Sequence, residues 1–195
     1  MAEMYPIYLK LAGREVLVVG AGRVAWRKVE ALLKADAAVR VVAPEVCAEL
    51  RELAAEAKLV LHERQWEPDD CTGALIVVAA TGDSELNARI RISAHEHNAL
   101  VNAVDDPPNC DFYVPAVARF GELRLAISTQ GQVPLISSRV RQYLEKALPP
   151  ELADVVKSTA RERERLLQSV ENDRVRLRRL RAFLEAELER WGLKL

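Results

Sequence analysis

The clearest chemical pattern in the sequence is a glycine-rich segment, residues 20–25, which reads G-x-G-x-x-A and directly follows the apolar stretch 15–19. In such a segment the first glycine permits a tight turn, the second lets the backbone approach a pyrophosphate, and the small third residue lets the next helix pack closely on the sheet. Backbone amides at the start of that helix then point at the anion. The sequence therefore predicts that a dinucleotide binds at Gly20, Gly22, Arg23, Val24 and Ala25, the alternative being a tight turn without a ligand.

An acidic residue suited to binding ribose follows the next predicted strand. That strand, residues 39–43, ends at Ala43 and is followed by Pro44 and Glu45. Glu45 lies 23 positions after Gly22, a spacing typical of a ribose contact, and no basic residue directly follows the strand to receive a 2′-phosphate. We therefore expect NAD rather than NADP, bound in part by Ala43, Pro44 and Glu45. The alternative for Glu45 is an acid at the start of a helix, where the helix dipole favours it.

A candidate base, Asp105, directly follows the predicted strand 100–104. The carboxyl edge of an open α/β sheet is where ligands bind, and a carboxylate within hydrogen-bond reach of a substrate can take its proton. Aspartate and proline are also common in turns, so the residue types alone favour a turn, and Asp106 is assigned to that turn. Thr81 and Asn102 also lie near strand ends, and we expect them either to contact the nicotinamide half of the cofactor or to make loop hydrogen bonds.

The elements that must position these residues alternate between strands and helices up to about residue 106. Short apolar runs rich in β-branched residues indicate buried parallel strands, and apolar residues at helical spacing indicate the helices between them. This alternation predicts a Rossmann-type parallel sheet covered by helices on both faces. The expected strands are 15–19, 39–43, 59–61, 74–80 and 100–104, and the expected helices begin near residues 24, 46 and 83.

The pattern changes after the sheet. Two strand-like runs, 112–118 and 122–128, suggest a hairpin, and Pro134 opens a helix that ends before two prolines at 149–150. The remainder is helical and divides into two helices near residues 171–173. We therefore predict an α/β protein with three parts: a Rossmann NAD-binding domain, a small α+β dimerisation region and a C-terminal helical region, at residues 1–111, 112–148 and 149–195.

Composition restricts the function classes further. The chain has 195 residues with 28 Lys and Arg against 29 Asp and Glu, which argues against a generally basic nucleic-acid-binding protein. The arginine-rich segment 161–181 is interleaved with acids and predicts a solvated helix with ion pairs. The three cysteines and three histidines have no metal-type spacing, so no resident metal site is predicted. With no membrane helix and no signal peptide apparent, we expect a cytoplasmic protein without membrane or nucleic-acid partners.

Several motifs, taken in order and at their spacing, resemble the precorrin-2 dehydrogenase family, the N-terminal module of siroheme synthase that also occurs as a free-standing protein. The resemblance covers about residues 4–145, and we expect the free-standing form. The motifs are Tyr5-Pro6-Ile7-Tyr8, the segment 16–28, Val41-Val42-Ala43-Pro44-Glu45, Ala79-Ala80-Thr81-Gly82-Asp83, the segment 101–107, the segment 110–116, and Ala126-Ile127-Ser128-Thr129.

The resemblance implies an enzyme that oxidises precorrin-2 to sirohydrochlorin with NAD as hydride acceptor, in siroheme and tetrapyrrole biosynthesis. Some members of the family also insert ferrous iron, so a transient ferrous or cobaltous ion is a candidate second substrate, and a homodimer is expected. The alternative is a non-catalytic, NAD-sensing regulatory protein with a Rossmann domain, which would need the phosphate loop without the later motifs.

The resemblance also implies roles for individual residues. It places the functionally important aspartate of the family at Asp105, which favours catalysis over the turn at this position, and it places a substrate-binding loop at Ser128 and Thr129. The sequence departs from the family pattern in the segment 130–133, where one glycine and one hydroxyl are missing, and at Gly82, where an acid is common. The departure at 130–133 falls in the predicted substrate-binding loop and bears on how that loop places the substrate.

Overall fold

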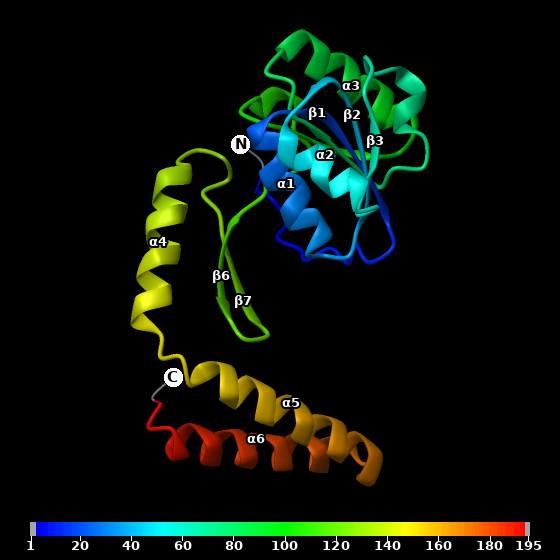
Figure 1. The fold of residues 1–195 in the computed structure, drawn as a ribbon. Coiled ribbons are helices and arrows are strands. Elements are labelled where there is room, and N and C mark those ends of the chain that lie inside the picture. The colour runs from blue at the N-terminus through cyan, green and yellow to red at the C-terminus, as the bar shows by residue number, and fades with distance from the viewer. Residues whose placement is uncertain (1–2, 194–195) are drawn as a thin grey trace. The chain divides into compact units, whose positions relative to one another are not determined.

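The computed structural model describes residues 3–193 and divides into two compact units, with the boundary between Val114 and Pro115 (Figure 1). The first unit contains the sheet and its helices, and the domain predicted over residues 1–111 lies within it. The second contains the hairpin and the helices that follow it.

The first unit is built on a five-stranded parallel sheet in the order β3-β2-β1-β4-β5. Its two central strands, β1 and β4, consist mostly of buried apolar residues, because helices cover both faces of the sheet there. The order reverses between β1 and β4, so the chain winds outward in both directions from the centre, as in a Rossmann fold. The strands are β1 (Glu15–Ala21), β2 (Ala38–Val46), β3 (Val60–His62), β4 (Ile76–Ala79) and β5 (Leu100–Ala103).

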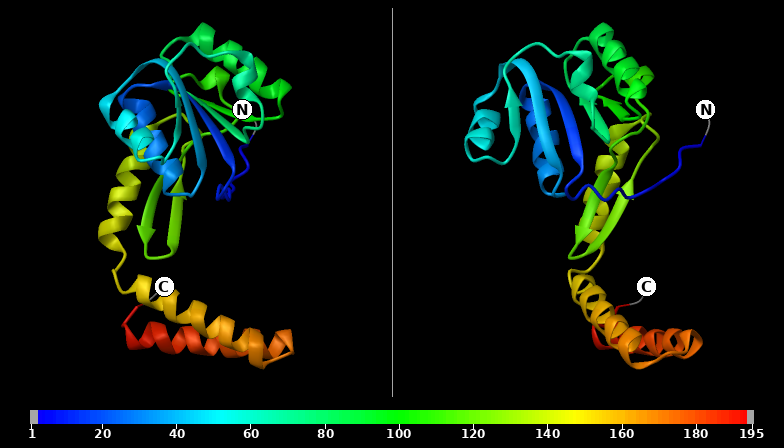
Figure 2. Two further views of the ribbon diagram at one scale, coloured as in Figure 1. Left: turned by 45° about the vertical axis from the view of Figure 1, so that its right-hand side comes forward. Right: turned by 90° about the vertical axis from the view of Figure 1, so that its right-hand side faces the viewer.

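Helices cover the two faces of this sheet (Figure 2). On one face, α1 (Arg23–Leu33) and α2 (Ala48–Ala55) contribute Ala25, Val29 and Leu50 to a core that includes Val16 and Val18 of β1. On the other face, α3 (Ser84–Glu96) contributes to a second core, together with the short 3₁₀ helix η1 (Pro68–Cys71). The Rossmann-type fold predicted from the sequence is confirmed, including the N-cap of α3, where the Asp83 carboxylate accepts two backbone N–H groups.

The second unit begins with the antiparallel hairpin of β6 (Ala116–Phe120) and β7 (Leu123–Ile127). Its two-residue turn contains Gly121 at a φ of +57°, and a Cβ there would lie 2.9 Å from the Ala153 side chain, so a glycine is needed. The helices α4 (Pro134–Ala147), α5 (Leu152–Ser169) and α6 (Asp173–Arg190) follow, and α4 packs on the hairpin while α5 packs on α6.

The arginine-rich helices carry the ion pairs that their charge pattern predicts. Arg165 lies 2.6 Å from the Glu162 carboxylate, Arg190 lies 3.3 Å from Glu187, and Arg176 pairs with Asp173. Each pair is three positions apart, which is the spacing of neighbours on a helix surface. Within the part of the chain that the structure describes, no helix combines the length and apolar character needed to span a membrane.

Candidate functional site

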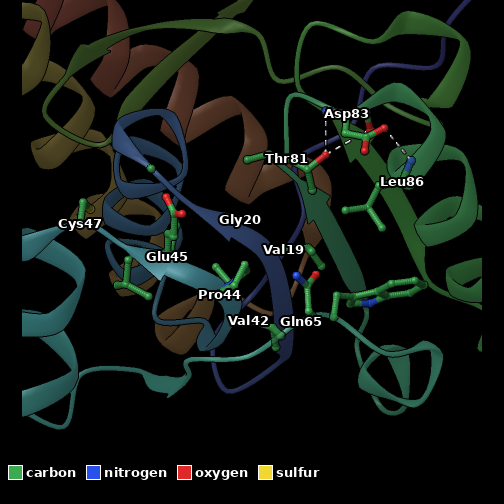
Figure 3. Close-up of a pocket in the computed structure, with 16 residues that line it drawn as sticks. Val19, Gly20, Val42, Pro44, Glu45, Cys47, Gln65, Thr81, Asp83 and Leu86 are labelled. Carbon is green, nitrogen blue, oxygen red and sulfur yellow. Dashed lines mark hydrogen bonds between the residues drawn. The ribbon is translucent and has the colours of Figure 1, made fainter.

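A pocket of about 580 Å³ opens at the carboxyl ends of β1, β2 and β4 (Figure 3). It lies where the strand order reverses, the position at which open α/β sheets bind their ligands. Its volume is within the range of small-molecule sites. The pocket is lined by Val19, Gly20, Ala21, Gly22, Val42, Ala43, Pro44, Glu45, Val46, Cys47, Gln65, Trp66, Ala80, Thr81, Asp83 and Leu86.

The two glycines of the phosphate loop are required for different reasons. Gly20 has a φ of +100°, and a Cβ there would lie 2.4 Å from the carbonyl oxygen of Ala80, so the fold itself demands glycine. Gly22 has a φ of −83°, and a Cβ there would meet nothing within 4 Å. Since Gly22 lines the pocket, its lack of a side chain keeps open the space through which a ligand approaches the backbone.

The start of α1 supplies donors to this open space. Gly22 is the N-cap residue, and no side chain caps the helix. The first backbone N–H groups of a helix have no partner within the helix, so those of Arg23, Val24 and Ala25 are available to an anion. The side chains of these three residues do not line the pocket, and Ala25 is fully buried against the sheet. A pyrophosphate therefore fits this cradle through backbone amides.

Glu45 reaches the pocket because β2 continues past the point where the sequence suggested that it ends. The register shifts between the pairs Val19–Val42 and Ala21–Val46, and the chain passes through Pro44 within this irregular part of the strand. A proline is tolerated there because a bulge frees its position from the hydrogen-bond ladder. Figure 3 shows Glu45 and Thr81 on opposite sides of Gly20, so a carboxylate and a hydroxyl flank the phosphate loop.

Two predicted cofactor contacts have side chains with partners inside the protein. The Thr81 hydroxyl lines the pocket and donates to the Oδ1 atom of Asn87 at 2.7 Å. Asn102 is 5% exposed, does not line the pocket, and donates from Nδ2 to the carbonyl oxygen of Phe112 at 2.9 Å. The Oδ1 atom of Asn102 is buried and has no partner among residues 3–193. Contact of either residue with nicotinamide stays a prediction.

Asp105 lies two positions beyond the end of β5, on the carboxyl edge of the sheet that also carries the pocket. Its side chain is exposed, its φ is +56°, and its carboxylate has no hydrogen-bond partner in the described part of the chain. Burial lowers the pKa of the Lys28 ammonium, while the nearby Asp105 carboxylate and the Cys110 thiol oppose that shift. Asp105 is therefore an accessible carboxylate with a basic residue of α1 in its surroundings.

The predicted substrate residues lie in the second unit, in the loop before α4. The Ser128 hydroxyl accepts the backbone N–H of Gln130 at 3.0 Å, and the Thr129 hydroxyl accepts that of Val133 at 3.0 Å. Both side chains thus shape the segment that departs from the family pattern. Binding of a substrate by Ser128 and Thr129 stays a prediction.

The sequence did not point to Gln65, Trp66 or Leu86 as residues of the pocket. Trp66 and Gln65 lie in the irregular segment between β3 and η1, where neither helical nor strand periodicity indicates an orientation. Trp66 is nevertheless buried, and the Arg89 guanidinium lies 6.0 Å from the centre of its ring. Among residues 3–193, no three His, Cys, Asp or Glu side chains are grouped so that they could hold a metal ion.

Comparison with known proteins agrees with this geometry. A family model described as "Putative NAD(P)-binding" matches residues 7–116. The siroheme synthase of Photorhabdus laumondii subsp. laumondii is 37% identical over 183 residues, covering 94% of this chain and 38% of the relative. The siroheme synthase of Neisseria meningitidis serogroup C is 39% identical over 160 residues, covering 82% of this chain and 33% of the relative. The chain therefore spans about a third of the length of these relatives.

A solved structure of SirC, precorrin-2 dehydrogenase, is similar over the whole of that protein. The match has a TM-score of 0.73 and 30% sequence identity, and it covers 95% of this chain and 100% of the other. The chain belongs to the precorrin-2 dehydrogenase and siroheme synthase family of NAD(P)-binding proteins.

Proposed function

We propose that this protein catalyses the NAD-dependent oxidation of precorrin-2 to sirohydrochlorin in the cytoplasm, as a step of siroheme or another tetrapyrrole biosynthesis. In the balanced reaction, precorrin-2 loses two electrons and two hydrogens. One hydrogen leaves as a hydride that converts NAD⁺ to NADH, and the other leaves as a proton. Membership of the family and the similarity to SirC support the reaction.

The observation that carries the proposal is the presence of a phosphate cradle and an exposed carboxylate on one edge of the sheet. Backbone amides at the start of α1 hold the pyrophosphate, and Glu45 accepts a hydrogen bond from a ribose hydroxyl. When bound, NAD supplies the hydride-accepting nicotinamide. The Asp105 carboxylate accepts the proton that leaves the macrocycle, since it has no competing hydrogen bond among the described residues.

Turnover separates this proposal from the non-catalytic alternative. Precorrin-2 is mixed with NAD and the protein, and the visible absorbance of sirohydrochlorin is followed. A protein that binds NAD without forming sirohydrochlorin would instead be an NAD-sensing regulator. Repeating the reaction with ferrous or cobaltous ion as an additional substrate tests whether the same protein also inserts a metal.

Glu45 should make the protein prefer NAD to NADP. A carboxylate that accepts a ribose hydroxyl repels a 2′-phosphate, and a hydrogen bond to a charged group contributes about 1.5–3 kcal/mol. We therefore expect kcat/KM to be roughly 10- to 100-fold higher with NAD. Glu45→Gln, which keeps the size of the side chain and removes its charge, should reduce this preference. A higher kcat/KM with NADP in the unmodified protein would show that other residues contact the ribose.

Homodimerisation is proposed to use the exposed apolar face of α4. Three apolar side chains of this amphipathic helix are exposed: Leu135 by 80%, Tyr143 by 70% and Ile136 by 52%. Contiguous exposed apolar side chains are typical of interaction surfaces, and a dimer with twofold symmetry uses the same surface of both subunits.

Light scattering should therefore give the mass of a dimer. Leu135→Glu should shift the protein toward monomer, because a charge would be buried at the apolar contact. Ile92→Glu is the matched control: Ile92 is 61% exposed on α3, outside the proposed interface, and its replacement should leave the mass unchanged. A monomer at all concentrations, or equal behaviour of the two variants, would remove α4 from the interface.

A further inference from the structure

The loops that follow β4 and β5 are joined by one buried asparagine. Asn87 lies in the first turns of α3 and is 2% exposed. Its Oδ1 atom accepts a hydrogen bond of 2.7 Å from the hydroxyl of Thr81, which lines the cofactor pocket. Its Nδ2 atom donates at 3.1 Å to the Oδ2 atom of Asp106, the residue after Asp105. A single side chain thus links the pocket to the loop of the candidate base.

Asp106 is held by more than this one contact. The same Oδ2 atom also accepts from the Asn109 amide at 2.9 Å and from the Ser84 hydroxyl at 3.0 Å. These hydrogen bonds, that of Asn109 foremost, stabilise the charged form and lower the pKa of the Asp106 carboxyl. Asp106 therefore remains an anion that accepts three donors from two segments of the chain.

Asp105, the neighbouring residue, has a backbone conformation that these hydrogen bonds of Asp106 help to maintain. Asp105 has a φ of +56°, a conformation that residues other than glycine adopt at a cost in free energy and keep only where their surroundings impose it. The 3₁₀ helix η2 (Pro107–Asn109) closes the other end of the loop, where the Asn109 N–H donates to the Asp106 carbonyl oxygen at 3.0 Å. Asp106 thus anchors the backbone of Asp105 through both its side chain and its carbonyl group.

We propose that Asn87 and Asp106 are positioning residues that hold Asp105 in its reactive place and couple it, through Thr81, to occupation of the cofactor pocket. The chemistry suits this role, because an amide offers an acceptor to the Thr81 hydroxyl and a donor to the Asp106 carboxylate. A leucine at position 87 has a similar size and can do neither. The catalytic part of the inference rests on the function proposed above, whereas the coupling part does not.

Hydrogen–deuterium exchange of the full-length protein with and without NAD tests the coupling directly. In the unmodified protein, NAD should slow exchange in the phosphate loop, residues 20–25, and also in residues 104–110. In Asn87→Leu the phosphate loop should still be protected, while the protection of residues 104–110 should be lost. Glu85→Leu is the control, because Glu85 is exposed in the same helix and belongs to no part of the Asn87–Asp106 contact.

Kinetics tests the positioning. Asp106→Ala should lower kcat by about 10- to 100-fold with little change in KM for NAD, since small displacements of a reacting group have effects of this order. Asp106→Asn should restore most of kcat, because its amide oxygen can still accept from Ser84 and Asn109. In an Asp105→Ala background, Asp106→Ala should have no further effect, as expected of a residue that acts through another.

Two results would overturn the proposal. The first is NAD-induced protection of residues 104–110 that persists in Asn87→Leu. The second is that Asp106→Ala lowers kcat as much in the Asp105→Ala background as it does in the unmodified protein. If the unmodified protein binds NAD but does not oxidise precorrin-2, the proposed function fails, and the exchange experiment alone then decides whether the two loops are coupled. If Asn87→Leu does not fold, Asp106→Ala replaces it in the exchange experiment, with the same expected loss of protection.

Discussion

Asp105→Ala should slow single-turnover oxidation of precorrin-2 by about 10²–10⁴-fold at saturating NAD, the loss typical of removing a general base. The expectation follows from an exposed carboxylate that lies on the same edge of the sheet as the pocket and has no hydrogen-bond partner among residues 3–193. NAD affinity should be almost unchanged, because the pyrophosphate is bound by backbone amides at the start of α1. Rapid mixing gives the rate, and calorimetry gives the affinity.

Asp105→Asn is the matched control for the backbone. Alanine at a φ of +56° is strained, whereas asparagine adopts this conformation about as readily as aspartate. Both variants should be slow, and Asp105→Asn should melt at the higher temperature. If metal insertion also occurs, Asp105→Ala should reduce it with preformed sirohydrochlorin. Equal oxidation rates for Asp105→Ala and the unmodified protein would assign Asp105 to the turn alone.

Gly22→Asp should weaken NAD binding by about 100-fold or more while leaving the fold intact. A Cβ at Gly22 meets nothing within 4 Å, so the protein accommodates the new side chain. The carboxylate would nevertheless occupy the space in front of the α1 amides and repel the pyrophosphate, and such a like-charge contact costs about 3 kcal/mol. Calorimetric titration gives the affinity, and thermal unfolding verifies the fold.

Gly22→Ala and Gly20→Ala complete the series. Gly22→Ala adds bulk without charge and should weaken binding less than Gly22→Asp. Gly20→Ala should instead destabilise the protein, because its Cβ would collide with the carbonyl oxygen of Ala80. Unchanged NAD affinity in Gly22→Asp would remove the loop from the cofactor site. A loss of stability in Gly22→Asp as large as that in Gly20→Ala would show that Gly22 is also structural.

The sequence predicts the first unit well because buried parallel strands and amphipathic helices each leave a periodic pattern. The apolar runs that end at Gly20, Ala43 and Ala80 mark strands that meet at one edge, and so the phosphate loop and Thr81 lie together in the pocket as expected. The hairpin and the later helices are predicted by the same periodicity and by the prolines between them.

Features that depend on contacts between distant segments were not predictable. Pro44 marks the end of a strand in the sequence, yet β2 continues to Val46 because the register shift at Gly20 accommodates a residue without an N–H group. Asp106 is indistinguishable from an ordinary turn residue until the fold brings Asn87 to its carboxylate. Trp66 joins the pocket from a segment with no periodicity, so nothing local indicates which way its ring faces.

On the catalytic role proposed for Asp105, stability and turnover favour different amino acids at this position. A φ of +56° costs a residue with a side chain on the order of 1 kcal/mol, a cost that glycine avoids, but glycine carries no carboxylate. A lineage released from the need to oxidise precorrin-2 would therefore drift toward glycine at this position while keeping Gly20 and Gly22. The residue at position 105 would then distinguish descendants that still catalyse from those that have become sensors of the dinucleotide.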